Sequence, residues 1–385
     1  MTIHTAFASV RSLPRLLAAA VAAGLLLSGC GTAAAPTASE EPAVHAELMP
    51  LAELPLLTDP KSYVGESTAV LYDSAIEPVV ANPTQSLPVT VTSRDRAGDQ
   101  PVTVTDTSRI VGLSLSGNIA ATVVSLGLGD NLVGRDVATS FPGLQDLPLV
   151  TKAGHALDIE ALLSVNPSLV ITDGTIGPLD VVLQIRDAGI PLVFVDEEPS
   201  IENVYRVTEQ VAAALGVPEA GEVLIERQRA EIEAKLAEIA AIAPQGDDRL
   251  RMAVFYLRGG SGIYYLLGSD AGSGVLIDSL GGIDVAREIG WDGAKPMTDE
   301  ALIQINPDLI IVMTSGLESA GGVDGLLEQK PAIALTAAGQ HRRFVSMKDT
   351  DLLSFGPRTA GILDALARAV YSPEDQGVTL TPIAQ

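Results

Sequence analysis

The 385-residue chain is poor in several residue types: it has one Cys, one Trp, four His and only 24 Lys and Arg residues. One Cys cannot form an internal disulfide, and four His are few for a Mn or Zn site built from Asp, Glu and His. Because 48 Asp and Glu residues outnumber the basic ones, the formal net charge is −24. No segment supplies the basic surface that nucleic acids need, so a nucleic acid partner is not expected.

The composition is otherwise that of a folded protein. Hydrophobic residues make up 47% of the chain and charged residues 19%, which is typical of globular rather than disordered sequences. The length corresponds to about two domains of ordinary size.

The N-terminus has the pattern of an export signal. Arg11 and Arg15 precede an apolar run from Leu16 to Leu27, which is shorter than the roughly 20 residues that a membrane-spanning helix needs. The run leads into Leu27-Ser28-Gly29-Cys30, which resembles a lipobox. We therefore expect residues 1–29 to be a lipoprotein signal peptide and Cys30 to carry the lipid, a diacyl or palmitate type of anchor, that holds the protein at the extracellular face of the cell membrane. A plain cleavable signal followed by a buried Cys is the alternative.

The remaining chain divides into five segments. Residues 30–86 begin with an Ala-, Pro- and Glu-rich stretch without helical or strand periodicity, and we expect them to be a flexible tether. Alternating β-branched and polar residues on both sides of a turn predict a β-hairpin over residues 87–107. We assign an N-terminal lobe to residues 87–217, a connecting helix to 218–244, a C-terminal lobe to 245–373 and a tail to 374–385.

Both lobes alternate short apolar runs with helical patterns. The runs IVGLSL, LVIT and PLVFVD in the first lobe, and MAVFYL, LIIVMTS and FVSM in the second, are typical of buried parallel strands. Residues 218–244 are rich in Ala, Glu and Leu without internal Pro, which predicts one helix about 33 Å long. The expected fold class is α/β, with two Rossmann-like lobes joined by a single long rigid helix.

The lobes share an internal repeat. Residues 157–171 read LDIEALLSVNPSLVI and residues 297–311 read MTDEALIQINPDLII, so that Glu160 aligns with Glu300 at an offset of 140. Each copy predicts a short helix that ends at Asn-Pro, because proline disfavours helix at the preceding residue, and a buried strand after it.

This arrangement resembles the substrate-binding lipoproteins of ABC importers, specifically the helical-backbone group that serves siderophores, cobalamin and heme, over residues 87–372. The resemblance implies a ligand cleft between the lobes, in agreement with the rule that open α/β sheets bind ligands beyond the carboxyl ends of their strands. The stretches TKAGHALDIE and VFYLRGGSGIYYLLG are similar to the hemin-uptake members of Gram-positive bacteria. In that family a His and a Tyr from opposite lobes bind the heme iron, and an Arg two residues after the Tyr hydrogen-bonds its oxygen. The resemblance gives these roles to His155, Tyr256 and Arg258, with heme b, as ferric hemin, as the transported ligand.

The chemistry of these residues agrees with the resemblance. Ferric iron favours an anionic oxygen ligand, and a neighbouring guanidinium helps a Tyr with a pKa near 10 to become phenolate. Tyr256 and Arg258 are two apart on an expected strand and so face the same side. The structural alternatives are a surface or capping role for His155 and a core position for Tyr256 with Arg258 solvated nearby.

Five further residues are weaker cleft candidates. Met313, Trp291 and Tyr264 could pack on a porphyrin, although side chains alternate along a strand and at most one of Tyr264 and Tyr265 can face the cleft. Arg135 and Arg358 are candidates for the propionates, and Arg358 also opens a helix, where it could be structural.

The repeated glutamates have two interpretations. Glu160 and Glu300 each lie in the first turn of an expected helix, where an acidic residue is favourable for the helix itself. The resemblance implies instead that they dock onto an ABC permease dimer, which acts with its ATPase, while the binding protein is a monomer.

The expected function is capture of hemin and its delivery to the permease for heme and iron uptake. A ferric-siderophore or cobalamin binder would keep the fold and the glutamates but would not need a facing His and Tyr. An extracellular enzyme is the other class, but the chain has no G-x-S-x-G, G-x-x-x-x-G-K-[ST], G-x-G-x-x-G or HExxH motif.

Overall fold

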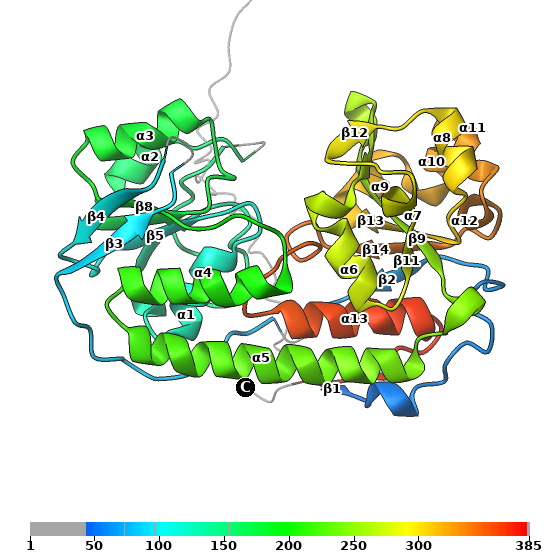
Figure 1. Cartoon of the computed structure of the whole chain (residues 1–385), viewed down its shortest axis with the longest axis horizontal. Coiled ribbons are helices and arrows are strands. Elements are labelled where there is room, and N and C mark those ends of the chain that lie inside the picture. Colours follow the sequence, from blue (N-terminus) through cyan, green and yellow to red (C-terminus); the bar gives the residue numbers. More distant parts are fainter. Residues whose placement is uncertain (1–43, 73, 96–97, 153–154, 383–385) are drawn as a thin grey trace, which may run out of the picture. The chain divides into compact units, whose positions relative to one another are not determined.

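The computed structural model describes residues 44–72, 74–95, 98–152 and 155–382. Two α/β lobes are joined by helix α5 (Pro218–Ile242), which confirms the α/β class and the connecting helix (Figure 1). α5 begins with Pro at its first turn, where the missing N–H costs nothing, and buries Leu224, Ile232 and Ile239.

The first lobe is built on a parallel sheet with strand order β6-β5-β7-β8. Its strands are β5 (Ile110–Leu113), β6 (Leu132–Arg135), β7 (Leu169–Thr172) and β8 (Leu192–Phe194). Its helices are α1 (Asn118–Ser125), α2 (Ile159–Ser164), α3 (Leu179–Asp187) and α4 (Ile201–Ala214). The expected hairpin is confirmed as β3 (Val89–Ser93) paired with β4 (Gln100–Val104). It lies against β8, since Ser93 Oγ accepts the N–H of Phe194 at 2.9 Å.

The second lobe has the strand order β12-β10-β9-β13-β14-β2, with β11 beside β9. Its strands are β9 (Arg251–Arg258), β10 (Ile263–Leu267), β11 (Ile283–Asp284), β12 (Ala294–Pro296), β13 (Leu309–Met313), β14 (Phe344–Met347) and β2 (Ser67–Ala69). Its helices are α6 (Ser273–Ser279), α7 (Val285–Glu288), α8 (Asp299–Ile305), α9 (Thr314–Ser319), α10 (Gly322–Gln329), α11 (Pro331–Ala334), α12 (Ala337–Gln340) and α13 (Thr359–Tyr371). β9, β13, β14 and β2 run parallel, so their carboxyl ends meet at one edge.

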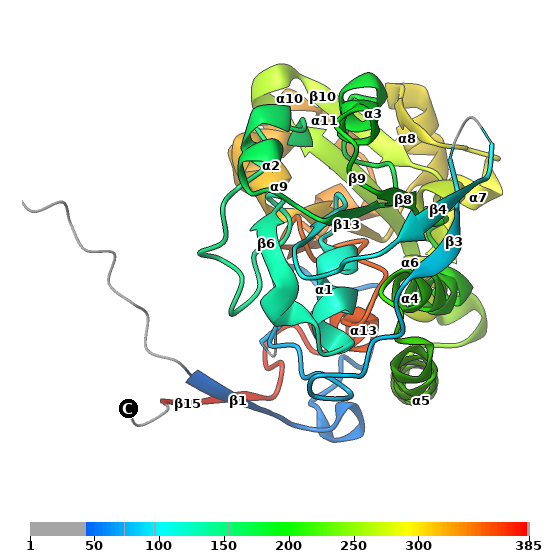
Figure 2. The same ribbon diagram turned by 90° about the vertical axis from the view of Figure 1, so that its left-hand side faces the viewer.

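The tether prediction is wrong for residues 44–86. β2 completes the second sheet beside β14, and Leu51 and Leu54 are buried in the core of the second lobe. β1 (Val44–Leu48) pairs with β15 (Val378–Pro382), so the expected C-terminal tail is also structured, and Figure 2 shows this ribbon projecting away from the sheets. These strands are three to five residues long and are held by pairing with distant parts of the chain, which leaves no local periodicity to detect.

The repeat is confirmed in three dimensions. α2 and α8 each begin at a capping residue, Asp158 or Thr298, whose side chain accepts the N–H three residues later. Each ends before an Asn in the left-handed region, with φ of 47° at Asn166 and 36° at Asn306. A strand, β7 or β13, follows in both lobes.

Loops at the carboxyl edges of the two sheets are hydrogen-bonded to each other. Lys348 Nζ, after β14, donates to Ser140 Oγ of the first lobe at 3.0 Å. Asn118 Nδ2 donates to the carbonyl of Phe355 at 3.2 Å, and Ser354 Oγ to that of Ser116 at 3.3 Å. These bonds hold the two carboxyl edges together, where the ligand rule for α/β sheets predicts a site.

Candidate functional site

Four residues meet at the carboxyl ends of β9, β13 and β14. The guanidinium carbon of Arg258 is 4.5 Å from the centre of the Tyr256 ring. Arg258 Nη2 donates to Oδ2 of Asp349, which follows β14, at 3.1 Å. The N–H of Ser315, which follows β13, donates to Oδ1 of the same carboxylate at 3.0 Å. Because neighbouring parallel strands end at the same edge of the sheet, the loops that follow them lie together there. Residues far apart in the sequence therefore form one cluster.

Tyr256 is half-buried and packs, as Met313 and Leu353 do, against the core cluster of the second lobe. The ring of Tyr265 lies 6.4 Å from it, centre to centre, because the two residues are register partners on β9 and β10. Arg258 contacts the face of the Tyr256 ring, and no hydrogen bond from it to the phenolic oxygen is present among the described residues. The guanidinium instead lies over the ring as a cation–π contact.

His155 is brought to the same place from the first lobe. It has a left-handed backbone (φ 62°), and its Nδ1 is buried without a hydrogen-bond partner among the described residues. Burial lowers the pKa of His155, the positive charge of Arg258 lowers it further, and the carboxylate of Asp349 opposes the shift. The imidazole is therefore held in its neutral form, which is the form that binds metal. Charges from the second lobe act on this first-lobe ring, so the three predicted residues share one electrostatic environment.

The first lobe contributes two buried carboxylates at the carboxyl ends of its strands. Asp136, after β6, accepts backbone N–H groups of Ser114 (2.8 Å) and Thr139 (2.7 Å). Asp173, after β7, accepts both the N–H and the hydroxyl of Thr175. Burial raises the pKa of each to about 6, and for Asp173 the charges of Asp136 and Glu197 add to the effect.

We expect Asp173→Asn to alter the pH dependence of stability. The pKa of Asp173 is higher in the folded state than in the unfolded state, so its contribution to stability is full below about pH 4 and is lost as the pH rises through 6. An Asn carbonyl can keep both bonds from Thr175, because both reach the same oxygen. We take the free energy of unfolding in urea of the variant minus that of the wild type. This difference should be ~1 kcal/mol more positive at pH 7.5 than at pH 5, because only the wild type loses the contribution of Asp173. Exposed Asp180 gives the control, Asp180→Asn, and equal differences at both pH values for Asp173→Asn would contradict the assignment.

Apolar side chains surround these polar groups. Leu115 and Val137, each one residue beyond Ser114 or Asp136, are exposed on the first lobe. Tyr265 and Met313 are half-buried on the second. Exposed apolar residues at a carboxyl edge suit a flat, largely apolar ligand, and a neutral imidazole with a cation-supported phenol suits a ferric centre within it.

Two of the weaker candidates, Tyr264 and Trp291, lie on the opposite face of the second sheet. Tyr264 packs on the other face of the second sheet and donates to Gln329, so of the two consecutive tyrosines it is Tyr265 that shares the face of Tyr256. Trp291 packs on that other face too, with its indole N–H donating to the carbonyl of Leu266 at 3.2 Å. The two faces of β10 could not be told apart from the sequence, because both faces of this strand are packed against other elements and neither is marked by polar residues.

The two arginines proposed for propionates have partners in the fold. Arg135 Nε donates to the carbonyls of Gln145 and Leu147 at 3.0 and 3.2 Å. Arg358 is only 8% exposed and pairs with Asp351, 2.9 Å away, while its guanidinium covers the ring of Phe141. Both arrangements are structural. Met313 alone among the weaker candidates packs against the same core cluster as Tyr256.

Glu160 and Glu300 are both exposed, and their carboxylates have no hydrogen bond or ion pair among the described residues. They occupy the second position of α2 and α8. The carboxylates are thus free to meet an external cation at equivalent places in the two lobes.

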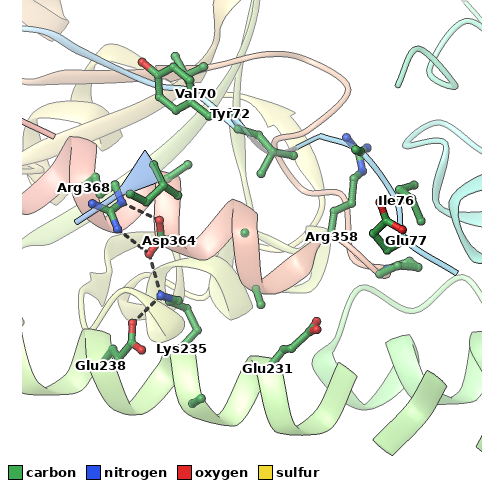
Figure 3. Close-up of a pocket in the computed structure, with 18 of the residues that line it drawn as sticks. Val70, Tyr72, Ile76, Glu77, Glu231, Lys235, Glu238, Arg358, Asp364 and Arg368 are labelled. Atoms are coloured by element: carbon green, nitrogen blue, oxygen red, sulfur yellow. Dashed lines mark hydrogen bonds and ion pairs between the residues drawn. The ribbon is translucent and has the colours of Figure 1, made fainter. Parts of the chain in front are cut away.

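A large cavity of about 620 Å³ lies away from this cluster, between α5, α13 and residues 70–77. Figure 3 shows Asp364 there between Lys235 and Arg368, with Lys235 also reaching Glu238. Most of the charged groups that line it pair with one another, so its walls are a structural network joining two helices rather than a set of free ligand groups.

Sequence reasoning missed Asp349 and the two buried carboxylates. Asp173 and Asp349 lie one and two residues after expected strands, so the carboxyl-end rule applied to those strands would have found them. Asp136 follows β6, a strand that was not expected from the sequence. Cys30 and the signal peptide lie outside the described residues. In the described part of the chain, no helix has both the length and the apolar character needed to cross a bilayer.

Two α/β lobes, a single connecting helix and a site at facing carboxyl edges define a bilobal substrate-binding protein. The chain matches the family described as periplasmic binding protein over residues 113–350, and it belongs to that family. It is a substrate-binding protein of an ABC importer and not an enzyme.

Several known proteins are similar to it. The crystal structure of heme binding protein HmuT is 40% identical, covers 82% of this chain and 100% of its own, and has a TM-score of 0.76. Other HmuT structures carry Ala in place of an Arg, a His or a Tyr. Periplasmic heme-binding protein RhuT from Roseiflexus sp. RS-1 is 36% identical over 70% of this chain and 99% of its own, with a TM-score of 0.61. The ABC transporter substrate-binding lipoprotein YvrC of Bacillus subtilis is 26% identical over 293 residues, 75% of this chain and 87% of YvrC.

Proposed function

We propose that this protein binds ferric heme between its lobes, with His155 and Tyr256 as axial ligands of the iron and Arg258 supporting the tyrosinate, and delivers it to an ABC permease for iron uptake. The observation that carries the proposal is the cluster of Tyr256, Arg258 and Asp349 at the carboxyl edge of the second lobe. His155 of the first lobe, with its buried and unpartnered Nδ1, is exposed to the same two charges. A neutral imidazole and a phenolate from opposite sides would satisfy the two axial positions of a ferric porphyrin.

The relatives support the same ligand. HmuT and RhuT are both heme-binding proteins. The Tyr and the Arg replaced in the HmuT variants are two positions apart in that protein, with the His about a hundred positions earlier, and Tyr256, Arg258 and His155 have the same order and nearly the same spacing.

Titration of the purified mature protein with hemin tests the ligand. We expect a sharp Soret band that saturates at one hemin per protein, because two protein ligands impose a single coordination geometry. Ferric siderophores and cobalamin in parallel titrations should not compete. Saturable binding of either, with no change in the hemin spectrum, would favour the siderophore or cobalamin alternative.

Glu160 and Glu300 are proposed to dock the protein onto two equivalent sites of the permease. We expect the Glu160→Ala/Glu300→Ala double variant to lower stimulation of the permease ATPase ~10-fold with its hemin titration unchanged, because two unpaired carboxylates lose their cationic partners. Glu222→Ala, an exposed glutamate on α5, is the matched control. Wild-type stimulation by the double variant would exclude this role.

The proposal includes the lipid anchor. Cys30 follows a lipobox-like sequence, and YvrC is a substrate-binding lipoprotein. Lipidation of Cys30 would hold the protein at the outer face of the cell membrane, beside its permease.

A further inference from the structure

The two repeat helices expose an apolar side chain at the same place in each lobe. Leu163 is 41% exposed on α2 and Ile303 is 46% exposed on α8. They are equivalent at the 140-residue offset, and residues 161–170 have the same pattern of buried, intermediate and exposed positions as residues 301–310. The exposure is therefore a property of the repeat rather than of one helix.

Each apolar side chain lies beside an unpaired carboxylate. Leu163 and Ile303 follow Glu160 and Glu300 by three residues, and positions three apart on a helix share a face. The helices do not need these side chains for packing, because Leu162 and Leu302, one residue before, make the core contacts. Because each of these side chains is more than 40% exposed, a polar residue there would cost the fold less than one at Leu162 or Leu302.

Two equivalent patches within one chain fit a partner that offers the same site twice. Each patch presents one negative charge and one bulky apolar group, so its complement is a cation beside an apolar pocket. The permease of an ABC importer is a dimer of equivalent subunits, so its two-fold symmetry offers the same site twice. Figures 1 and 2 both show α2 and α8 at the end of the lobes away from α5, so the patches face away from the connecting helix.

We propose that Leu163 and Ile303 are paired apolar anchors that insert into equivalent pockets of a permease dimer, each next to the basic group that meets Glu160 or Glu300. This inference rests on the docking part of the proposed function, and it adds the residues that would contribute most of the binding energy. Buried apolar anchors at the middle of an interface, surrounded by polar contacts, carry a large part of binding energy.

The test uses the full-length lipoprotein and the purified permease–ATPase complex in lipid nanodiscs, with affinity measured with and without hemin. Leu163→Gln and Ile303→Gln should each weaken binding ~10-fold, and the double variant more than either, because Gln keeps helix propensity but removes the apolar contact. Val223→Gln, at a 47% exposed position of α5, is the matched control and should bind as wild type does.

Salt separates the anchors from the glutamates. The loss in the Gln variants should persist at 0.5 M NaCl, whereas the loss in the glutamate variants should shrink there, because salt screens exposed charges. The proposal would be overturned if the double variant bound the permease with wild-type affinity, or if only one of the two single variants lost affinity. It would also be overturned if the wild-type protein formed a homodimer that the double substitution dissociated. Hemin binding is measured by titration of the same variants, independently of permease binding. A protein that binds the permease but not hemin would refute the heme assignment, while the permease affinities would still decide the role of Leu163 and Ile303.

Discussion

Replacing Tyr256 with Phe is expected to weaken hemin binding by ~100-fold or more, since losses of 10- to 100-fold are common even for groups that only support a metal ligand. The substitution removes one oxygen and keeps the ring, so packing against the second-lobe core and the stacking of Arg258 are retained. The iron would keep His155 but lose its anionic ligand. Absorption spectra should show the loss of the tyrosinate-to-iron charge-transfer band, and competition with apomyoglobin measures the affinity.

Tyr265→Phe is the matched control for this experiment. Its ring is 6.4 Å from that of Tyr256 on the same face of the sheet, so the same atom is removed in nearly the same surroundings. We expect its affinity to stay within ~3-fold of wild type, as for a surface hydroxyl without a metal bond. A charge-transfer band lost in Tyr265→Phe and kept in Tyr256→Phe would move the ligand to Tyr265, and one kept in both variants would refute phenolate ligation.

The sequence was sufficient for those parts of the fold that carry a strong local pattern. The long helix α5, the β3–β4 hairpin and the two repeat helices are each specified by composition, alternation or capping within one segment. β1, β2 and β15 are specified instead by partners far away in the chain, and β2 is three residues long, so their sequences resemble a linker. Periodicity is a local signal and cannot report pairing of this kind.

The candidate site shows the same division. Tyr256 and Arg258 could be predicted to touch because they lie two apart on one strand, and they do. The partnership of Arg258 with Asp349 spans 91 residues and depends on the order of strands in the sheet, which the sequence does not state. The choice between Tyr264 and Tyr265 depends on which face of β10 turns toward Tyr256, and only the register with β9 decides it.

The ion network between α5 and α13 has a different role from the ligand site. Asp364 is 7% exposed and accepts bonds from Arg368 (Nε, 2.6 Å) and from Lys235 of α5 (2.8 Å). Arg368, 4% exposed, also donates to the carbonyls of Met49 and Gln376. One buried carboxylate therefore holds the cation that ties both terminal segments to α13.

Asp364→Ala should lower the free energy of unfolding by ~3–5 kcal/mol, because removal of one member of a buried ion pair leaves the other charge without compensation. Urea unfolding of the ligand-free protein measures this change. Glu238→Ala is the control, since Glu238 pairs with the same Lys235 but is 49% exposed, and exposed pairs contribute at most about 1 kcal/mol. Asp364→Leu/Arg368→Met should recover part of the loss, because it removes the stranded charge, although the carbonyls of Met49 and Gln376 lose their donor. Equal effects of Asp364→Ala and Glu238→Ala would mean that solvent reaches Arg368 and that the network is not a buried clamp.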